Sequence, residues 1–358
     1  MTFQSLGLAE ELLKAIEQTG YTTPTPVQMQ AIPAVIGGSD LLVSSHTGSG
    51  KTAAFTLPAL HKLIDRRPSP GAGPRVLVLT PTRELAQQVE KAVQTYGKSL
   101  RWLNTACLVG GAPFFAQAKQ LQRPVDVVVA TPGRLLDHLN RRKLKLSDIE
   151  VLILDEADRM LDMGFAEDID AIVAATPAKR QTLLFSATLE GVVGAMAERM
   201  TRNPLRIEIE VAKENRGQIE QRLMFADDMG HKSRLLEALL ATDGLQQAVV
   251  FTATKKSADE LSLSLQEKGF AAAALHGDMH QTQRTRTLDR LRQGRIGVLV
   301  ATDVAARGID VAGISHVINF DPPRQAEDYV HRIGRTGRAG RDGVAITLSG
   351  PRDRKSVV

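Results

Sequence analysis

Short aliphatic runs recur along the whole chain, and polar or helix-periodic segments separate them. Runs such as 76–79 and 151–154 contain no polar residue, a pattern typical of parallel strands that are buried on both faces of a sheet. Between such runs, apolar residues at helical spacing, as in 256–266, predict α-helices. The alternation of strand and helix predicts an α/β fold with mostly parallel sheets.

The predicted strands fall into two series, one in each half of the chain. In the first half we expect strands at 41–43, 76–79, 105–109, 127–130, 151–154 and 182–186. A further strand is expected at 207–211, and the polar segment 213–218 is interpreted as the linker or its edge. In the second half we expect strands at 221–225, 248–251, 271–275, 297–300, 316–320 and 344–348. Two parallel-sheet domains follow from this arrangement.

Length and composition fit a two-domain enzyme and narrow the choice of partners. The chain has 358 residues, 43% of them hydrophobic, which is ample for two α/β cores. The net charge of +5 makes an acidic partner plausible, and nucleic acid is the leading candidate. The single Cys107 excludes an internal disulfide, and Glu10 and Glu11 lie where a signal peptide would be apolar. Because the apolar runs are also too short to cross a bilayer, we expect a cytoplasmic protein.

A glycine-rich segment follows the first predicted strand and precedes a helical pattern. Its sequence is Thr47-Gly48-Ser49-Gly50-Lys51-Thr52. In this position glycines let backbone N–H groups turn towards a phosphate, and the start of the following helix adds positive potential. Lys51 can reach the outer phosphates of a nucleoside triphosphate, and Thr52 can ligate Mg2+. The generic pattern has a leading Gly where this chain has Ser45, so a simple glycine-rich turn is the alternative interpretation.

A second polar set, Asp155-Glu156-Ala157-Asp158, follows the apolar run 151–154 directly. In open α/β sheets ligands bind at the carboxyl ends of the strands, where these carboxylates would lie. Asp155 can hold Mg2+ through water, and Glu156 can orient and polarise an attacking water. The alternative is that these acids cap the N-terminus of a helix.

With both sites in place, the sequence resembles the DEAD-box family of ATP-dependent RNA helicases, whose name spells residues 155–158. The resemblance covers nearly the whole chain and rests on about ten motifs in order. It implies two tandem RecA-like domains, each a mostly parallel sheet with helices on both faces. We expect these domains at 1–208 and 219–358, with a linker at 209–218. The resemblance also implies that the ligands are ATP and Mg2+ and that the partner is RNA.

Further nucleotide and coupling residues in the first domain come from the resemblance. Tyr21 and Gln28 belong to a segment that is similar to the family's adenine-recognition element, and Phe3 would be its upstream aromatic partner. An amide can pair with N7 and N6 of adenine, and an aromatic ring can stack on the base, although Gln28 could equally point to solvent. Ser186-Ala187-Thr188 resembles the element that couples the ATP state to RNA binding, with hydroxyls that could bridge to Asp158.

In the second domain, the segment from His331 to Arg338 resembles the other wall of the family's nucleotide site. The resemblance makes Arg335 and Arg338 arginine fingers, and it gives His331 a coupling role. The arginines at 332, 335 and 338 are three residues apart, which would place them on one face of a helix. A solvated basic face is the alternative. Asp310 would accept a hydrogen bond from the ATP ribose.

The expected RNA contacts also rest on the resemblance. Small, backbone-exposing or basic groups at these positions suit phosphate and sugar contacts, so we expect binding that does not depend on base sequence. In the first domain the expected contacts are Pro81, Arg83, Gly111, Thr131, Pro132, Gly133 and Arg134. In the second domain they are Gln281, Arg284 and Thr302.

Together these observations predict an RNA-dependent ATPase that separates short RNA duplexes when its two domains close around ATP and RNA. An ATP-gated RNA clamp that anchors other proteins, and a DNA translocase, are the alternatives. We expect a monomer with protein partners in RNA processing, ribosome assembly or decay. A final core helix would be expected to start at 354–358, so a truncated C-terminal domain is a further possibility.

Overall fold

The computed structural model describes residues 2–45, 48–64, 73–209, 219–242, 244–306, 313–323, 325–337, 342–351 and 353. The chain divides into two compact units, Met1–Glu210 and Val211–Val358. Each unit is described by itself.

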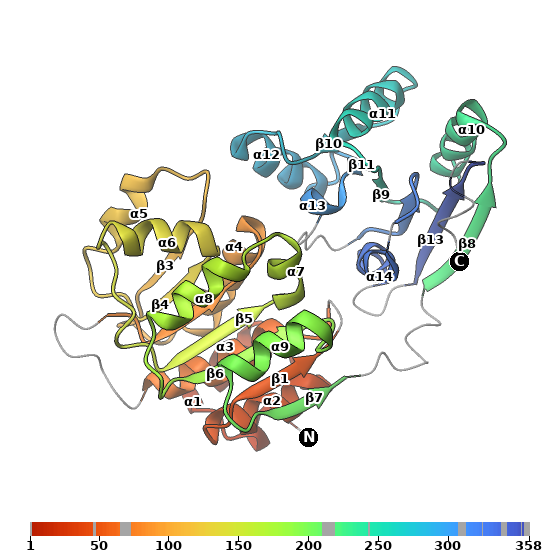
Figure 1. Cartoon of the computed structure of the whole chain (residues 1–358). Helices are drawn as coiled ribbons and strands as arrows, with labels where there is room; N and C mark the ends of the chain where they lie inside the picture. The colour runs from red at the N-terminus through yellow and green to blue at the C-terminus, as the bar shows by residue number, and fades with distance from the viewer. Residues whose placement is uncertain are drawn as a thin grey trace. The chain divides into compact units, whose positions relative to one another are not determined.

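The first unit is built on a seven-stranded sheet in the order β3-β4-β2-β5-β6-β1-β7 (Figure 1). Every neighbouring pair of strands is parallel. The strands are β1 (Leu41–Ser44), β2 (Val76–Leu79), β3 (Thr105–Leu108), β4 (Val127–Ala130), β5 (Val151–Asp155), β6 (Gln181–Ser186) and β7 (Leu205–Glu208).

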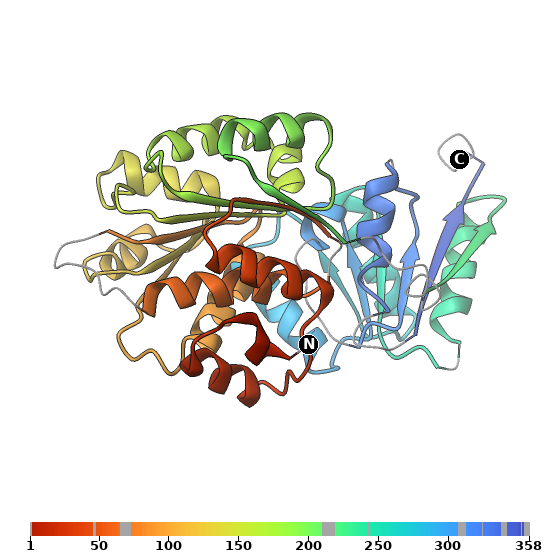
Figure 2. The same ribbon diagram turned by 90° about the horizontal axis from the view of Figure 1, so that it is seen from below.

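Helices cover both faces of this sheet. In Figure 2 the sheet lies between green helices on one side and red and orange helices on the other. The helices are η1 (Phe3–Leu6), α1 (Glu10–Gln18), α2 (Pro26–Ile36), α3 (Lys51–Ile64), α4 (Arg83–Tyr96), α5 (Phe114–Gln120), α6 (Pro132–Asn140), α7 (Ala157–Asp162), α8 (Ala166–Ala174) and α9 (Gly191–Met200).

Alternate residues of each central strand enter different cores. Leu41 and Val43 pack in a cluster with α1 to α4, whereas Leu42 packs in the cluster of α6 to α9. Because side chains alternate across a strand, a strand that is covered on both faces must be apolar at every position. This explains why the unbroken aliphatic runs identify the strands.

The second unit has a six-stranded parallel sheet in the order β10-β11-β9-β12-β13-β8. Its strands are β8 (Ile219–Phe225), β9 (Ala248–Phe251), β10 (Ala272–Leu275), β11 (Val298–Ala301), β12 (His316–Asn319) and β13 (Gly343–Ser349). Its helices are α10 (Met229–Leu240), α11 (Lys255–Glu267), α12 (Gln281–Arg292), α13 (Asp303–Ala306) and α14 (Ala326–Ile333). Two apolar clusters flank the sheet.

The predicted fold class is confirmed, with small errors at strand ends. The predicted strands 76–79, 127–130 and 248–251 match β2, β4 and β9. The strand expected at 207–211 is in fact Leu205–Glu208, because β7 pairs along the whole of the short β1, from Leu41↔Leu205 to Ser44↔Glu208. The predicted linker, apart from Ile209, lies outside the described residues.

In a parallel sheet all carboxyl ends of the strands meet at one edge, so segments that follow different strands are brought together there. Within the described part of the chain, no helix combines the length and the apolar character needed to cross a membrane.

Candidate active site

The glycine-rich segment joins β1 to α3, as predicted. Gly48 and Gly50 have φ angles of 87° and 90°, a backbone conformation that residues with a Cβ rarely adopt. A Cβ on Gly50 would also lie 2.6 Å from Nε2 of Gln28. Lys51, the first residue of α3, donates from Nζ to the carbonyl oxygen of Ser45 at 3.1 Å. Thr47 lies outside the described residues.

The structure explains why Ser45 can replace the usual leading Gly. Its φ is not positive, and its N–H donates to the carbonyl of Ser186 at 3.1 Å, which continues the β1–β6 ladder by one residue. Its hydroxyl accepts a hydrogen bond from the Ser49 hydroxyl at 3.2 Å. A side chain is therefore accommodated at position 45.

The carboxylates that follow β5 lie at the carboxyl edge of the sheet. Asp155 is the last residue of β5, and burial raises its pKa to about 7, although the Lys51 ammonium acts in the opposite direction. Glu156 is nearly buried and has a φ of 54° and a ψ of 54°. This left-handed conformation is strained for a residue other than Gly, and such strain is concentrated at functional sites.

The alternative helix-cap role is not what the Glu156 side chain does. Glu156 occupies the N-cap position of α7, but its side chain makes no capping hydrogen bond. The backbone of this turn is therefore strained, although the carboxylate does not cap the helix. The carboxylate remains available at the edge of the sheet where a ligand would bind.

The residues expected to hold Mg2+ have suitable chemistry. Oδ1 of Asp155 is buried and has no hydrogen-bond partner among the described residues. Thr52 lies in the first turn of α3, directly after the phosphate loop, and is half-buried. A carboxylate and a hydroxyl are the oxygen ligands that Mg2+ prefers, with water and phosphate completing its octahedron.

The segment that follows β6 is joined to the segment that follows β5. The hydroxyl of Ser186 accepts from the N–H of Asp158 at 3.3 Å and from the N–H of Thr188 at 3.4 Å. The Asp158 carboxylate accepts from the N–H of Ala187 at 3.4 Å. The link predicted between these motifs is thus made by one hydroxyl and main-chain amides, while the Thr188 hydroxyl accepts from the N–H of Glu190.

The predicted adenine-recognition element lies against the phosphate loop. Gln28 is nearly buried, which excludes the solvent-pointing alternative. Its Oε1 accepts from the N–H of Thr25 at 3.0 Å, and its Nε2 donates to the carbonyl of Gly50 at 3.1 Å. Tyr21 is 57% exposed, so its ring is open to a ligand, whereas Phe3 packs in the core beside α1 and α2.

Three of the predicted RNA-contact segments gather at the ends of β2, β3 and β4. Gly111 has a φ of 74°, and a Cβ there would lie 1.9 Å from Nη1 of Arg83. Arg134 donates to the carbonyl of Ala112 at 2.9 Å and forms an ion pair with Asp137. Around them, Pro81, Thr131 and Pro132 are buried and Gly133 is half-buried. The three segments are therefore linked at the carboxyl edge of the sheet, where Arg83 lies against Gly111 and Arg134 bonds to Ala112.

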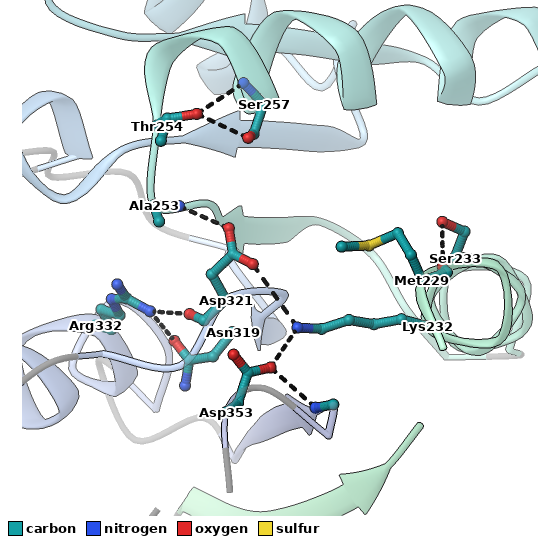
Figure 3. A network of polar contacts seen from close by, with 11 residues as sticks. Met229, Lys232, Ser233, Ala253, Thr254, Ser257, Asn319, Asp321, Arg332 and Asp353 are labelled. Atoms are coloured by element: carbon teal, nitrogen blue, oxygen red, sulfur yellow. Dashed lines mark hydrogen bonds and ion pairs between the residues drawn. The ribbon is translucent and has the colours of Figure 1, made fainter. Parts of the chain in front are cut away.

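In the second unit, the predicted helical cluster of arginines is wrong. Helix α14 ends at Ile333, and Gly334 is its C-cap, so Arg335 lies beyond the helix. Arg332 instead forms a two-pronged ion pair with Asp303, at 2.6 and 2.7 Å. It also donates to Oδ1 of Asn319 at 3.1 Å and to the carbonyl of Asp321 at 2.6 Å (Figure 3).

Arg332 is consequently a structural residue of the second unit. It is nearly buried, and its guanidinium lies 4.9 Å from the centre of the Phe251 ring. Figure 3 shows that Lys232 continues this network to Asp321 and Asp353. The network joins α10, α14 and the segments that follow β12 and β13.

Two of the predicted residues of this unit, Arg335 and Arg284, donate to main-chain oxygens. Arg335 is 5% exposed and donates from Nε to the carbonyl of half-buried His331 at 3.2 Å. Arg284 is also buried and donates to the carbonyls of His276 and Ala305, while Gln281 and Thr302 lie near it at the starts of α12 and α13. Asp310 and Arg338 lie outside the described residues.

We expect Arg332→Lys to destabilise the second unit by roughly 2–4 kcal/mol, because a lysine keeps the charge but loses the two-pronged geometry and leaves buried acceptors unpaired. Urea unfolding measures this loss. The control is Arg222→Lys, which alters the exposed pair with Glu220 in the same unit and should leave the unfolding midpoint unchanged. Equal midpoints for wild type and Arg332→Lys would contradict a structural role for Arg332.

The interactions of two residues, Ser44 and Asp303, were not identified from the sequence. The hydroxyl of Ser44 donates to the carbonyl of Ala187 at 3.1 Å, so it ties the end of β1 to the segment after β6. Asp303 holds Arg332. The only sequence signal for either residue is a polar side chain directly after an apolar strand, which many loops share.

Comparison with known families matches residues 25–195 to the DEAD/DEAH box helicase family and residues 230–340 to the helicase conserved C-terminal domain. The ATP-dependent RNA helicase SrmB of Haemophilus influenzae is 46% identical over 357 residues, which cover 99% of this chain and 80% of that protein. SrmB of Escherichia coli is 46% identical over 348 residues, or 97% of this chain and 78% of that protein.

Among solved structures, this chain is similar to Dbp5 of S. cerevisiae bound to RNA and ADP BeF3. The identity is 35% and the TM-score is 0.86, and the match covers 98% of this chain and 89% of Dbp5.

Proposed function

Because the chain belongs to the DEAD-box family of ATP-dependent RNA helicases, we propose that the residues at the carboxyl edge of its first sheet carry out the family's reaction. The family's activity is RNA-stimulated hydrolysis of the ATP phosphoanhydride, coupled to local unwinding of RNA duplexes by closure of two domains. The proposal concerns which residues of this chain do the work.

The phosphate loop binds the outer phosphates of ATP. The N–H groups around Gly48 and Gly50 face the phosphate oxygens. Lys51 leaves the carbonyl of Ser45, to which it donates in the structure, and binds the phosphates instead. Asp155 and Thr52 would hold Mg2+, Asp155 through water. Bound there, the ion would neutralise charge on the phosphates.

Glu156 is the general base that orients the attacking water and takes its proton. The observation that carries the proposal is the backbone conformation of this residue directly after β5. Glu156 has a strained left-handed backbone at the carboxyl edge of the sheet, beside Asp155, and its side chain makes no capping bond. A helix cap does not require a strained backbone, so the strain at Glu156 favours a functional role for this residue.

Coupling to RNA runs through the hydrogen bonds around Ser186. Asp158 and Ala187 lie at adjacent strand ends, and Ser44 and Ser45 connect Ala187 and Ser186 to the phosphate loop. A change in the loop when the phosphates leave is therefore transmitted to Thr188 and the chain after it. In the closed state Arg335 and Arg338 reach the γ-phosphate, His331 supports them, and Asp310 accepts from the ribose.

RNA is held through its backbone, without reading of bases. Arg83, Arg134 and the main chain at Gly111 form the first-unit surface for phosphate and sugar. In the second unit Gln281, Arg284 and Thr302 contact RNA, and the bonds of Arg284 to the carbonyls of His276 and Ala305 hold its guanidinium in place.

The same proposal includes four further features of the protein. They are RecA-like domains at 1–208 and 219–358, a monomeric state, a cytoplasmic location and protein partners in RNA metabolism.

Strand release tests the function as a whole. A short RNA duplex with one labelled strand should separate when ATP is added to wild type, and separation should be slow with Glu156→Gln. Retention of the duplex on wild type without separation would favour the clamp alternative.

Gln28→Ala should weaken ATP binding more than GTP binding, because loss of the bonds to Thr25 and Gly50 affects both nucleotides, whereas loss of the paired hydrogen bonds to the base affects adenine alone. The preference for ATP should fall by roughly 10-fold or more in a competition assay. Tyr21→Ala serves as a comparison, since loss of stacking should weaken both nucleotides. If Gln28→Ala reduced ATP and GTP binding equally, Gln28 would be only a structural link between Thr25 and Gly50.

A further inference from the structure

A surface of the first unit, made by α5 and the end of α6, combines an exposed aromatic ring with basic side chains that the proposed reaction does not use. We propose that this aromatic-basic surface, defined by Phe115, Lys119 and Arg141, is a second RNA-contact site. There Phe115 stacks on an unpaired base of the strand beyond the contacts at Gly111 and Arg134. The inference rests on the proposed function, because it extends the path of the same RNA.

The surface has a rigid support. The Phe114 ring stacks on the His138 imidazole with centroids 4.3 Å apart and an interplanar angle of 12°, and the Arg141 guanidinium lies 4.5 Å from the centre of the Phe114 ring. Gln117 approaches Nε2 of His138 at 3.4 Å and donates to the carbonyl of Val109 at 2.9 Å. These contacts fix α5 on α6 and on the end of β3 (Figure 1).

The supporting contacts leave Phe115 facing solvent. At 83% exposure it is the most exposed large apolar side chain in the described part of the chain. Phe114 and Gln117 occupy the inner side of α5, and the Phe115 ring meets the Phe114 ring edge to face with centroids 6.1 Å apart. Lys119 is exposed one turn later on the same face of α5. An aromatic ring beside cations is the arrangement that binds single strands, because every base has a face that can stack.

The segment that carries Lys119 and Arg141 is basic, which favours a polyanion. Residues 119–145 contain seven basic and two acidic side chains, whereas the whole chain has 45 and 40. Of the two acids, Asp126 is buried against the N–H of Asn104, and Asp137 is paired with Arg134. The basic residues are Lys119, Arg123, Arg134, Arg141, Arg142, Lys143 and Lys145.

The surface is continuous with the proposed RNA path. Only three residues separate Gly111 from Phe115, a span of at most ~14 Å in extended chain. Arg134 donates to Ala112 within this span, so the same guanidinium borders both regions. A strand that leaves the contacts at Gly111 therefore needs to continue only a short way to reach Phe115.

The test compares a short oligouridylate, which fills only the core contacts, with one about twice as long, in the presence of a non-hydrolysable ATP analogue. Wild type should bind the longer RNA more tightly. Phe115→Ala should lose about 10-fold in affinity for the longer RNA only, and Phe115→Trp should retain it. The control Lys179→Gln removes an exposed charge just before β6, at the opposite edge of the sheet, and should keep the length effect.

A fluorescent base gives a direct signal. 2-Aminopurine placed in turn along the longer RNA should be quenched at one outer position by wild type and not by Phe115→Ala. Equal affinities of wild type and Phe115→Ala for both lengths, without quenching of this kind, would overturn the inference and point to an acidic protein partner instead. Failure of wild type to bind either RNA would instead contradict the proposed function.

Discussion

Arg335→Ala should reduce RNA-stimulated ATP hydrolysis by about 10³–10⁵-fold, the effect that an arginine finger has in other phosphoryl-transfer enzymes. The guanidinium stabilises charge that develops on the transferred phosphoryl group, so its loss should affect turnover far more than ATP binding. Because Arg335 belongs to the second unit, the first unit should keep nearly its full affinity for nucleotide. Steady-state hydrolysis and fluorescence titration with a labelled ATP analogue measure the two effects.

A control is needed because Arg335 is nearly buried and bonds to the carbonyl of His331. Urea unfolding should show a much smaller loss of stability for Arg335→Ala than for Arg332→Lys, since Arg332 carries the ion pair with Asp303. If Arg335→Ala hydrolysed ATP at the wild-type rate, Arg335 would be a structural residue like Arg332.

Glu156→Gln should slow hydrolysis by about 10²–10⁴-fold while ATP and RNA still bind nearly normally. The amide keeps the shape of the side chain but cannot accept the proton of the attacking water. The variant should therefore accumulate in the ATP-bound, RNA-bound state. Single-turnover hydrolysis together with equilibrium binding of both ligands separates these effects.

Lys51→Ala provides the contrast to Glu156→Gln. Removal of the ammonium takes away a charge partner of the phosphates, so ATP affinity itself should fall. Similar binding defects in the two variants would contradict the division of roles between Lys51 and Glu156. Wild-type turnover by Glu156→Gln would show that the base has been misassigned.

The fold was predictable because the central strands are buried on both faces. Runs such as Val76–Leu79 and Val127–Ala130 must be apolar throughout, so their ends could be read from the sequence. The edge strands β7 and β8 were placed less well. Their ends depend on pairing with β1 and β13, and most of their residues are exposed.

The place of a candidate site residue in the fold was predictable where a polar residue ends a buried strand, as with Asp155 and Ser186. What could not be predicted depends on conformation or on distant partners. The left-handed backbone of Glu156 has no sequence signature. The end of α14 at Ile333 separated Arg332 from Arg335, although their spacing had suggested one helical face. Ser44 meets Ala187, 143 residues away, only because β1 and β6 are neighbours.

The central claim is that ATP and RNA act together to close the two domains. Reciprocal coupling requires that each ligand raises the affinity for the other by the same factor. Fluorescence transfer between the domains reports closure directly. Since Cys107 is the single cysteine of the chain, Cys107→Ser followed by Lys179→Cys and Lys256→Cys gives one exposed labelling site in each unit.

In this labelled protein, transfer should rise fully only when a non-hydrolysable ATP analogue and single-stranded RNA are both present. Each ligand alone should leave the open state predominant, and Arg335→Ala should weaken the response to both. Full transfer with the nucleotide alone, or no change with both ligands, would contradict the account.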